Sequence, residues 1–591
     1  MKIIITYQII ENYHIYLKNM DISLDDRLNV LQQISQQKLV EILDAIPGTK
    51  DLVIEQKLMK ILDSFVGVSV LKRYGVEKIY KMEQGLKLSN TQHIFLISSD
   101  LIACKKVLDQ IQSEITYETL DIKPHIKPNH HILVTPFVPT VLNSIIEEEG
   151  LSGLVTLQTI SWEFIRLDGN ILSLENCMFI DLYYHKDTTL LPALARGLWS
   201  LQLILGSPKL TLTFGKYSQQ MLKIMQSMKQ CLGSSSIENE IGALIIMDRN
   251  YDLVTPLLTP VTYAGLLHEV VEINVGTGTL GNSQTKLDPD KDQIYGEVRD
   301  TPCSEVFPIL HGKAKSLKSE QNAIQTMKLS EMERYVATRL QKTRDLMRQL
   351  AFHISACQLI ADTLSSDFQT LQKIEKCILE CKERKECLNH IERYIDEHPL
   401  RTLRLFCLLS ITSDGITQTE LHSIQKLHLH AHGYKHIPLF YKLQNIGLLK
   451  CRSENILHKL PNWNSEWSNN AQKLKLLPSY FKQTEQKSRL GPSYVFNNVY
   501  VPLIAQILNT VVNQERDSKS LEELTNLSNC VISGQRGLLS PKIVVICIVG
   551  GITYAEITAC RFIEKSTGIR LVLTSDNIIT GNKILEKVQD I

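Results

Sequence analysis

Apolar runs typical of buried strands stand on both sides of a long helical pattern. Ile543-Val-Val-Ile-Cys-Ile-Val549 is unbroken and leads into the turn Gly550-Gly551. Ala243-Leu-Ile-Ile-Met247 has the same character far earlier in the chain. Runs of this kind form strands that are buried on both faces of a parallel sheet. We therefore predict that the C-terminal strand completes a sheet begun before residue 248, and that the chain between them is an insert.

The N-terminal region predicts a separate, smaller sheet. Three short apolar runs stand at Asp51-Leu-Val-Ile-Glu55, Ile94-Phe-Leu-Ile-Ser98 and Ile132-Leu-Val-Thr135. Helix-like stretches lie between them, for example from Leu58 to Leu71. Strands that alternate with helices are typical of a parallel α/β domain.

Local signals extend the α/β pattern into the split domain. Met178-Phe-Ile-Asp-Leu182 predicts a strand, and Leu190 to Leu205 predicts a helix closed by Gly206. Thr553-Tyr-Ala-Glu556 has the spacing of a capping box. The predicted division is an N-terminal α/β domain, a split α/β domain in two parts and a mainly helical insert, at residues 1–150, 151–258 with 500–591, and 259–499.

The insert carries the most regular helical pattern in the chain. Its apolar positions alternate by fours and threes, as in the seam of a coiled coil. These positions are Val336, Leu340, Thr343, Met347, Leu350, Ile354, Cys357 and Ala361. Three short helices are expected between Leu400 and Leu449, with a strand-like end at Leu448-Leu449. Residues 514–541 are polar and rich in serine, which predicts a linker.

Charge, cysteines and apolar runs exclude several classes of protein. The 64 Lys and Arg nearly balance the 63 Asp and Glu, which argues against nucleic acid as a partner. Thirteen scattered cysteines are typical of reduced thiols in the cytosol. No apolar run reaches the ~20 residues that span a bilayer, and Met1 to Ile10 does not fit a signal peptide. We expect a cytoplasmic protein that reaches membranes through partners.

One glycine motif raises the possibility of a nucleotide site. Gly276-Thr-Gly278-Thr-Leu-Gly281 matches the dinucleotide fingerprint as a string of letters. The fingerprint works only between a strand and a helix, and the polar run after Gly281 predicts no helix. The favoured interpretation is a mobile loop, and a nucleotide-dependent α/β enzyme is the alternative.

Other candidates for chemistry are equally weak. Two groups could hold a metal: Cys377, Cys381, Cys387 and His390; and His428, His430, His432 and His436. The first lacks paired zinc spacing, and alternate residues of the second point apart on a helix. Asp248 and Asp252 follow a buried strand without a partner base, so we expect them to cap loops. These patterns favour a binding scaffold, not an enzyme, with no cofactor and no metal.

Five motifs together resemble the Sec/Munc (SM) family, the SNARE-binding proteins of vesicle fusion. They begin with Asp248-Arg-Asn-Tyr-Asp252-Leu-Val-Thr255-Pro256 and continue through Thr262–Leu266, Glu297–Asp300, Tyr500–Leu503 and Ile548–Ile557. Within the family, Asp51–Glu55, Lys78–Lys81 and Leu405–Ile411 are most similar to the vacuolar protein sorting-associated protein 33 branch. The 33B type is the nearer match and the 33A type is the alternative.

The resemblance implies an arch of three domains that acts in vesicle docking and fusion. The N-terminal domain would clasp a syntaxin-type helix, and a hairpin in the insert would receive SNARE motifs of the syntaxin and R types. The hairpin residues carried over are Lys313, Lys315, Lys318 and Arg334. The alternative for these lysines is an ordinary solvated helix face.

The resemblance also implies a companion subunit of a tethering assembly. It would be VIPAR for a 33B-type chain, or the HOPS or CORVET core for a 33A-type chain. Tyr434 and Ile437, in Gly433-Tyr-Lys-His-Ile437, are the expected contacts, and the alternative is that both are core residues. The implied location is the cytoplasmic side of late endosomes, lysosomes or recycling endosomes.

Overall fold

The chain divides into two compact units. The computed structural model describes residues 23–120, 128–232, 240–324, 340–364, 367–452, 465–478, 491–513, 522–524, 527, 529–534, 539 and 542–590. The first unit comprises Met1–Arg166, Thr189–Gly206 and Ile224–Glu238, and the second comprises Leu167–Thr188, Ser207–Lys223 and Asn239–Ile591. The finer domain boundaries given above stay predictions.

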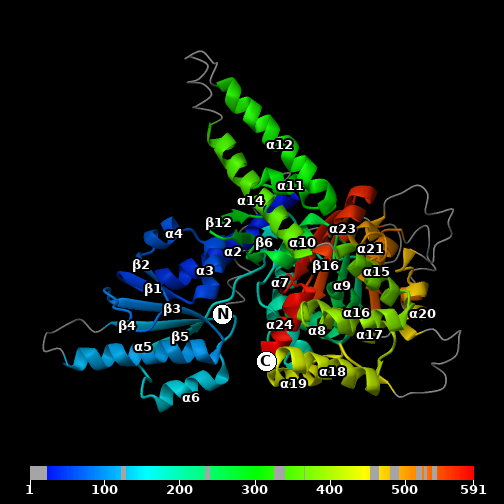
Figure 1. The fold of residues 1–591 in the computed structure, drawn as a ribbon. Coiled ribbons are helices and arrows are strands. Elements are labelled where there is room, and N and C mark those ends of the chain that lie inside the picture. Colours follow the sequence, from blue (N-terminus) through cyan, green and yellow to red (C-terminus); the bar gives the residue numbers. More distant parts are fainter. Residues whose placement is uncertain are drawn as a thin grey trace. The chain divides into compact units, whose positions relative to one another are not determined.

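The first unit is built on a parallel sheet with the strand order β2-β1-β3-β4-β5. Its strands are β1 (Lys50–Ile54), β2 (Val76–Lys81), β3 (Gln92–Ser98), β4 (Asn129–Thr135) and β5 (Val155–Thr159). Its helices are α2 (Leu24–Asp44), α3 (Gln56–Phe65), α4 (Val68–Arg73), α5 (Leu101–Leu120), α6 (Thr140–Glu148) and α7 (Leu191–Leu205). Helices α5 and α6 lie on one side of this sheet and α3 on the other (Figure 1).

The predicted N-terminal strands are confirmed as β1, β3 and β4, whose apolar residues are buried. Strands β2 and β5 were missed because most of their residues are partly or fully exposed, so neither carries an apolar run. The helix expected from Leu58 to Leu71 is two helices. Val66 between them is extended, with φ −132° and ψ 116°.

The second unit contains the split sheet, with the strand order β15-β8-β9-β16-β17-β7-β6. Its strands are β6 (Ile165–Asp168), β7 (Ile171–Ser173), β8 (Leu210–Phe214), β9 (Ile241–Asp248), β15 (Cys530–Gly534), β16 (Ile543–Val549) and β17 (Arg570–Ser575). Strand β16 pairs in parallel with β9, with Val544 beside Ala243 and Val549 beside Asp248. The prediction that the C-terminal strand completes the earlier sheet is therefore confirmed.

One predicted strand of the split domain is wrong. Met178–Leu182 enters a helical turn, which continues as the π-helix η1 (Asp181–His185). Short apolar runs fit a buried helical turn as well as a strand, and Phe179 here packs its ring against Tyr183. Both predicted helix caps are correct: Gly206 ends α7 with φ 87°, and Thr553 and Glu556 form a capping box at the start of α23 (Tyr554–Thr567).

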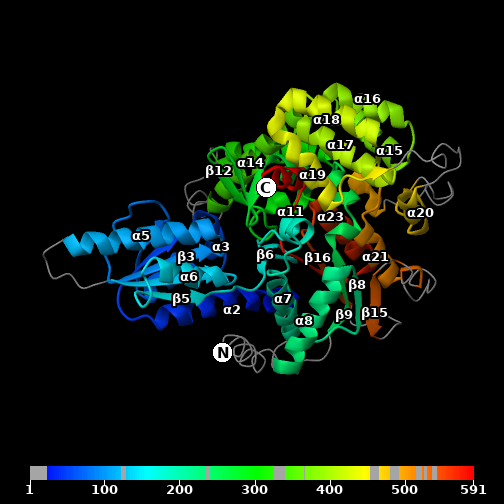
Figure 2. The ribbon, with the colours of Figure 1, turned by 90° about the horizontal axis from the view of Figure 1, so that it is seen from below.

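The insert is mainly helical, as predicted. Helix α9 (Val254–Leu257) precedes the insert. The helices of the insert are α10 (Tyr263–Val270), α11 (Gln293–Val298), α12 (Cys303–Ile324), α14 (Leu340–Leu364), α15 (Phe368–Leu379), α16 (Arg384–Tyr394), α17 (Pro399–Thr412), α18 (Gln418–His432), η3 (Tyr434–His436), α19 (Ile437–Ile446), α20 (Glu466–Lys473) and η6 (Pro492–Phe496). Helices α15 to α19 form one group (Figure 2). The strand expected at Leu448-Leu449 is instead β14 (Cys451–Arg452), which pairs with β13 (Ile416–Thr417).

Three further helices complete the split domain: α8 (Lys216–Leu232), α21 (Leu503–Val512) and α23 (Tyr554–Thr567). The chain ends on α24 (Gly581–Asp590). Within the described ranges, every helix is too short or too polar to span a lipid bilayer. All thirteen cysteines lie in described ranges, and each is a free thiol.

The coiled-coil seam predicted in the insert is only partly correct. Val336 lies outside the described residues, and Ala361 is exposed. The buried residues of α14 are Leu350, Phe352, His353, Ala356, Cys357 and Ile360. Helix α14 packs against α10, α11, α12 and the strand β12 (Ser283–Lys286), so it buries a wider face than one seam. Helices α12 and α14 run side by side (Figure 1).

Candidate protein-binding surfaces

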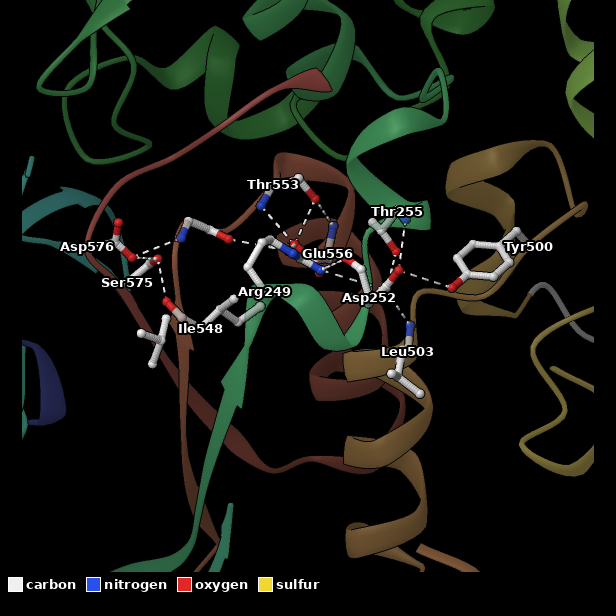
Figure 3. Close-up of polar contacts among 12 residues, drawn as sticks. Arg249, Asp252, Thr255, Tyr500, Leu503, Ile548, Thr553, Glu556, Ser575 and Asp576 are labelled. Atoms are coloured by element: carbon white, nitrogen blue, oxygen red, sulfur yellow. Dashed lines mark hydrogen bonds and ion pairs between the residues drawn. The ribbon is translucent and has the colours of Figure 1, made fainter. Parts of the chain in front are cut away.

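A fully buried ion pair lies where the SM-like motif begins. Arg249, with no exposed surface, places Nη1 2.8 Å from the Glu556 carboxylate. Glu556 also accepts hydrogen bonds from the backbone N and the hydroxyl of Thr553, both at 2.9 Å (Figure 3). The pair therefore joins the end of β9 to the start of α23, two segments that the insert separates in sequence.

Asp252 extends this network to the point where the chain returns from the insert. Its carboxylate accepts from the backbone N of Thr255 at 2.9 Å and from the backbone N of Leu503 at 3.3 Å. The Tyr500 hydroxyl lies 3.4 Å from the same group (Figure 3). Three distant parts of the sequence are thus held by one buried set of charges.

Asp248 and Asp576 cap backbone amides in the same region. Asp248 accepts from the backbone N atoms of Tyr217 and Ser218, at 2.8 and 2.7 Å, at the start of α8. Asp576 accepts from Gly550 and Gly551, at 2.7 and 2.9 Å. Burial raises the pKa of each aspartate to about 6, against the hydrogen bonds that lower it.

The structure therefore gives Asp248 and Asp252 the capping role that the sequence predicts. Their oxygens are occupied by backbone amides and hydroxyls, and both side chains are buried. Position 550 requires glycine because its backbone lies close to the Tyr183 ring. Gly550 has φ 101°, and a Cβ there would lie 2.7 Å from that ring. Side chains of the SM-like motif are thus buried and bonded within the second unit.

The Gly276 motif is not a mobile loop, and that expectation is wrong. It lies in an antiparallel sheet of β10 (Glu272–Asn274), β11 (Thr277–Leu280) and β12 (Ser283–Lys286). A strand, not a helix, follows Gly281. The amide-rich helix end that binds a pyrophosphate is therefore absent after this motif, which removes the support for a nucleotide site there.

The predicted hairpin residues fall on α12 and beyond it. Lys315 and Lys318 are exposed, and Lys313 is partly covered, with Nζ 2.8 Å from the Glu297 carboxylate. Arg334 lies outside the described residues. The sequence analysis missed Phe307, which is 56% exposed on α12 and stacks on the His311 ring. The spacing of apolar residues indicates the buried face of a helix, so it does not reveal an aromatic residue on the exposed face.

Tyr434 and Ile437 lie on an exposed apolar stripe, so the alternative that they are core residues is wrong. Tyr434 is 68% exposed and Ile437 is 50% exposed. Tyr441, missed by the sequence analysis, is 64% exposed on α19. Spacings of three and four place these three side chains on one face. We call Tyr434, Ile437 and Tyr441 the α19 stripe.

A cluster of histidines lies beside the α19 stripe. His428 Nε2 lies 3.0 Å from His436 Nδ1, and the His432 ring lies against His428. Burial, with His432 and His436 nearby, lowers the pKa of His428 to about 4. Residues four apart on a helix face one another, whereas His430 points away and is exposed. His428 is therefore held in the neutral form near pH 7.

The candidate zinc cysteines do not converge. Cys377 Sγ contacts Glu383 and Cys381 Sγ contacts the carbonyl of Thr412, each at 3.4 Å. Burial raises the pKa of the Cys387 thiol to about 12. Cys377 and Cys381 thus face different partners, which does not favour a shared metal ion.

Comparison with known proteins gives the family. The Sec1 family matches residues 50–587. Vacuolar protein sorting-associated protein 33B of Rattus norvegicus is 26% identical over 608 residues, which cover 95% of this chain and 97% of that protein. Vacuolar protein sorting-associated protein 33A of the same organism is 26% identical over 618 residues, which cover 95% and 98%.

Solved structures share the fold. The Unc18–syntaxin 1 complex from Monosiga brevicollis aligns with a TM-score of 0.60 at 16% identity, covering 94% of this chain and 99% of that chain. The SM protein Vps45 in complex with the Qa SNARE Tlg2 aligns with a TM-score of 0.59 at 15% identity, covering 95% and 97%. Since the family match extends over most of its length, the chain belongs to the Sec1 family.

Proposed function

We propose that this chain is a Sec/Munc scaffold that binds SNARE proteins and promotes their assembly, together with a tethering subunit, in endosomal and lysosomal traffic. The observation that carries the proposal is the Sec1 family match over residues 50–587. Two structural neighbours were solved with a syntaxin or a Qa SNARE bound. The relatives named for vacuolar sorting support the endosomal and lysosomal setting.

The physical task is to template helices. An isolated helix is marginal in water because its first turn is costly to form. A scaffold that holds two SNARE helices side by side raises their effective concentration. If it stabilises the half-assembled state by about 3 kcal/mol, assembly speeds by roughly a hundredfold. No covalent chemistry is needed.

The paired helices α12 and α14 are the proposed SNARE-binding hairpin. Lys315 and Lys318 project into solvent, and Phe307 adds an exposed aromatic ring. SNARE-type coils present apolar seams flanked by charges, so an aromatic anchor with basic residues on the same helix suits them. Lys313 supports the hairpin base through Glu297.

The α19 stripe is the proposed contact for the companion subunit. Tyrosine and a neighbouring aliphatic residue are typical anchors at protein interfaces. The underside of α19 is well supported, since Leu439, Phe440 and Leu443 are buried. For a 33B-type chain the companion would be VIPAR, and for a 33A-type chain it would be the HOPS or CORVET core.

The deciding experiment is affinity purification of the full-length chain from cells, with identification of the recovered subunits. We expect VIPAR, and recovery of intact HOPS subunits in its place would favour the 33A type. The double variant Tyr434→Ala, Ile437→Ser should lose the companion. Ile102→Ser, which changes an equally exposed side chain in the first unit, should keep it.

SNARE binding has its own test. The purified chain should bind SNARE-motif helices and accelerate liposome fusion, and Phe307→Ser should weaken both. If the folded wild type with its companion binds no SNARE helix, the scaffold proposal fails.

A further inference from the structure

A histidine–glutamate–histidine cluster in the first unit stands apart from the proposed binding surfaces. His93 of β3 and His130 of β4 are direct partners in the parallel ladder, so both rings project from one face of the sheet. Glu114 comes from α5, which packs against β3. The side chains of His93, His130 and Glu114 are 5%, 3% and 13% exposed. Two strands and one helix thus bring three potential ligands together inside the unit.

The ligand atoms converge on one oxygen. His93 Nδ1 lies 2.8 Å from Glu114 Oε2, and His130 Nε2 lies 3.0 Å from the same atom. The three ligand atoms all lie within 4.8 Å of one another. Tetrahedral zinc, with bonds of 2.0–2.2 Å, separates its ligand atoms by roughly 3.3 Å. Small side-chain rotations would therefore bring the three ligand atoms to that spacing.

Both nitrogens of the His93 ring face acceptor atoms. His93 Nε2 lies 2.9 Å from the carbonyl oxygen of Asn90, which can only accept, so Nε2 carries a hydrogen. Its Nδ1 faces the Glu114 carboxylate, another acceptor. A neutral ring can donate from only one of the two nitrogens. The Nδ1 lone pair of a neutral His93 ring and the carboxylate therefore face each other, and a cation between them would satisfy both.

The surroundings have the second layer of contacts that metal ligands usually have. The Asn90 carbonyl fixes the His93 tautomer that leaves Nδ1 free to coordinate. Asn90 is itself held by Asp51, which accepts from its backbone N at 3.0 Å and from its side chain at 2.7 Å. Gln110 Nε2 donates to Glu114 Oε1 at 2.7 Å and leaves Oε2 for the cluster.

The contacts of Glu114 also suit a ligand. Its Oε2 atom faces the two imidazole nitrogens, and its Oε1 atom accepts from Gln110. In the described part of the chain, the ion pairs of Glu114 are with histidine alone.

We propose that His93, Glu114 and His130 bind a divalent transition-metal ion, zinc by their donor set. Two imidazoles and one carboxylate form a known zinc donor set with a fourth position open to water. The ion would fasten α5 to β3 and β4. Its role would be to stabilise the first unit, because a ligand that binds only the folded state raises its stability.

The test is zinc binding by the full-length chain after removal of metal with EDTA. A competition titration against a chromophoric chelator should show about one site per chain. His130→Gln and Glu114→Gln should each weaken that site at least ~100-fold, since even outer partners of a metal cost 10- to 100-fold. His131→Gln is the matched control: it is the next residue of β4, on the other face, bonded to Gln92, and should keep the site. Zinc should raise the unfolding temperature of the wild type but not of Glu114→Gln.

Two results would overturn the site: no zinc bound by the wild type, or unchanged zinc affinity in Glu114→Gln. If the variants fail to fold, X-ray absorption of the zinc-loaded wild type decides. Nitrogen and oxygen ligands alone support the site, and sulfur ligands assign the zinc to the cysteines and reject it. The outcome is independent of whether SNARE helices or a companion subunit bind.

Discussion

The second unit contains two contrasting groups of residues, the buried network around Arg249 and the exposed α19 stripe. Arg249 and Glu556 have no exposed surface and are bonded to several partners. Tyr434 and Tyr441 are each more than 60% exposed. The network belongs to the motif by which the family is most easily identified, whereas the stripe carries no motif chemistry. The difference teaches that the motif residues at Arg249 are bonded within the fold, whereas residues proposed for binding, such as Tyr434 and Tyr441, are exposed.

The largest expected effect is loss of the buried guanidinium. Arg249→Met leaves Glu556 and Asp252 buried without a counter-charge, and breaking such a pair costs about 3–5 kcal/mol. We expect a large drop in the urea-unfolding midpoint of the purified chain. Arg348→Met is the control, because its pair with Asp345 is exposed and should be worth less than about 1 kcal/mol. Equal midpoints for the two variants would show that the network does not maintain the fold.

The next effect should be on binding and not on stability. Tyr434→Ala should weaken binding of the companion by about 2 kcal/mol, roughly 30-fold, as for an interface anchor. Its unfolding midpoint should stay close to that of the wild type, since the side chain is mostly exposed. Calorimetric titration of the companion and urea unfolding measure the two quantities. If Tyr434→Ala lowered the unfolding midpoint but left the affinity for the companion unchanged, Tyr434 would be a residue that maintains the fold and not a binding residue.

Apolar patterning predicted strands such as β9 and β16, which are buried along nearly their whole length and appear in the sequence as unbroken apolar runs. It missed strands without such a run, among them β15, which lies inside the predicted linker 514–541. It failed where tertiary context decides. Met178–Leu182 is helical, and α14 buries His353 between Tyr263 and Asp292, a polar arrangement that no seam rule predicts.

The candidate sites divide in the same way. Tyr434 and Ile437 came from the family resemblance, and only the structure shows that they are exposed. His93 and Glu114 are separated by a turn and most of a helix, so no local spacing connects them. The alternation of His428 and His430 suggested rings pointing apart, while the spacing of four that joins His428 to His432 went unused.

A smaller effect should follow pH beside the stripe. His428 has a folded pKa of about 4, below its ordinary value of 6.5, so protonation favours the unfolded chain. Its contribution to stability is complete above pH 6.5 and is lost as the pH falls toward 4. Between pH 7.5 and 5.5 the loss is about 1 kcal/mol. His428→Asn should flatten this part of the stability profile in urea unfolding, while His430→Asn, at an exposed position of α18, should keep it. An unchanged profile in His428→Asn would assign the pH dependence elsewhere.

The smallest expected effect tests whether the exposed lysines of α12 resemble the stripe or are ordinary solvated charges. Lys315→Glu with Lys318→Glu should leave the unfolding midpoint within about 0.5 kcal/mol of the wild type, since surface charges contribute little to folding. SNARE-helix affinity should fall by roughly 1 kcal/mol at low salt, and the loss should shrink at 0.5 M salt because exposed charges are screened. Lys313→Glu is a different case, because it places two carboxylates beside each other at Glu297 and should also lower stability. Binding that is unaffected at every salt concentration would leave Phe307 as the only described α12 residue still supported for the SNARE contact, and would make the lysines a solvated face.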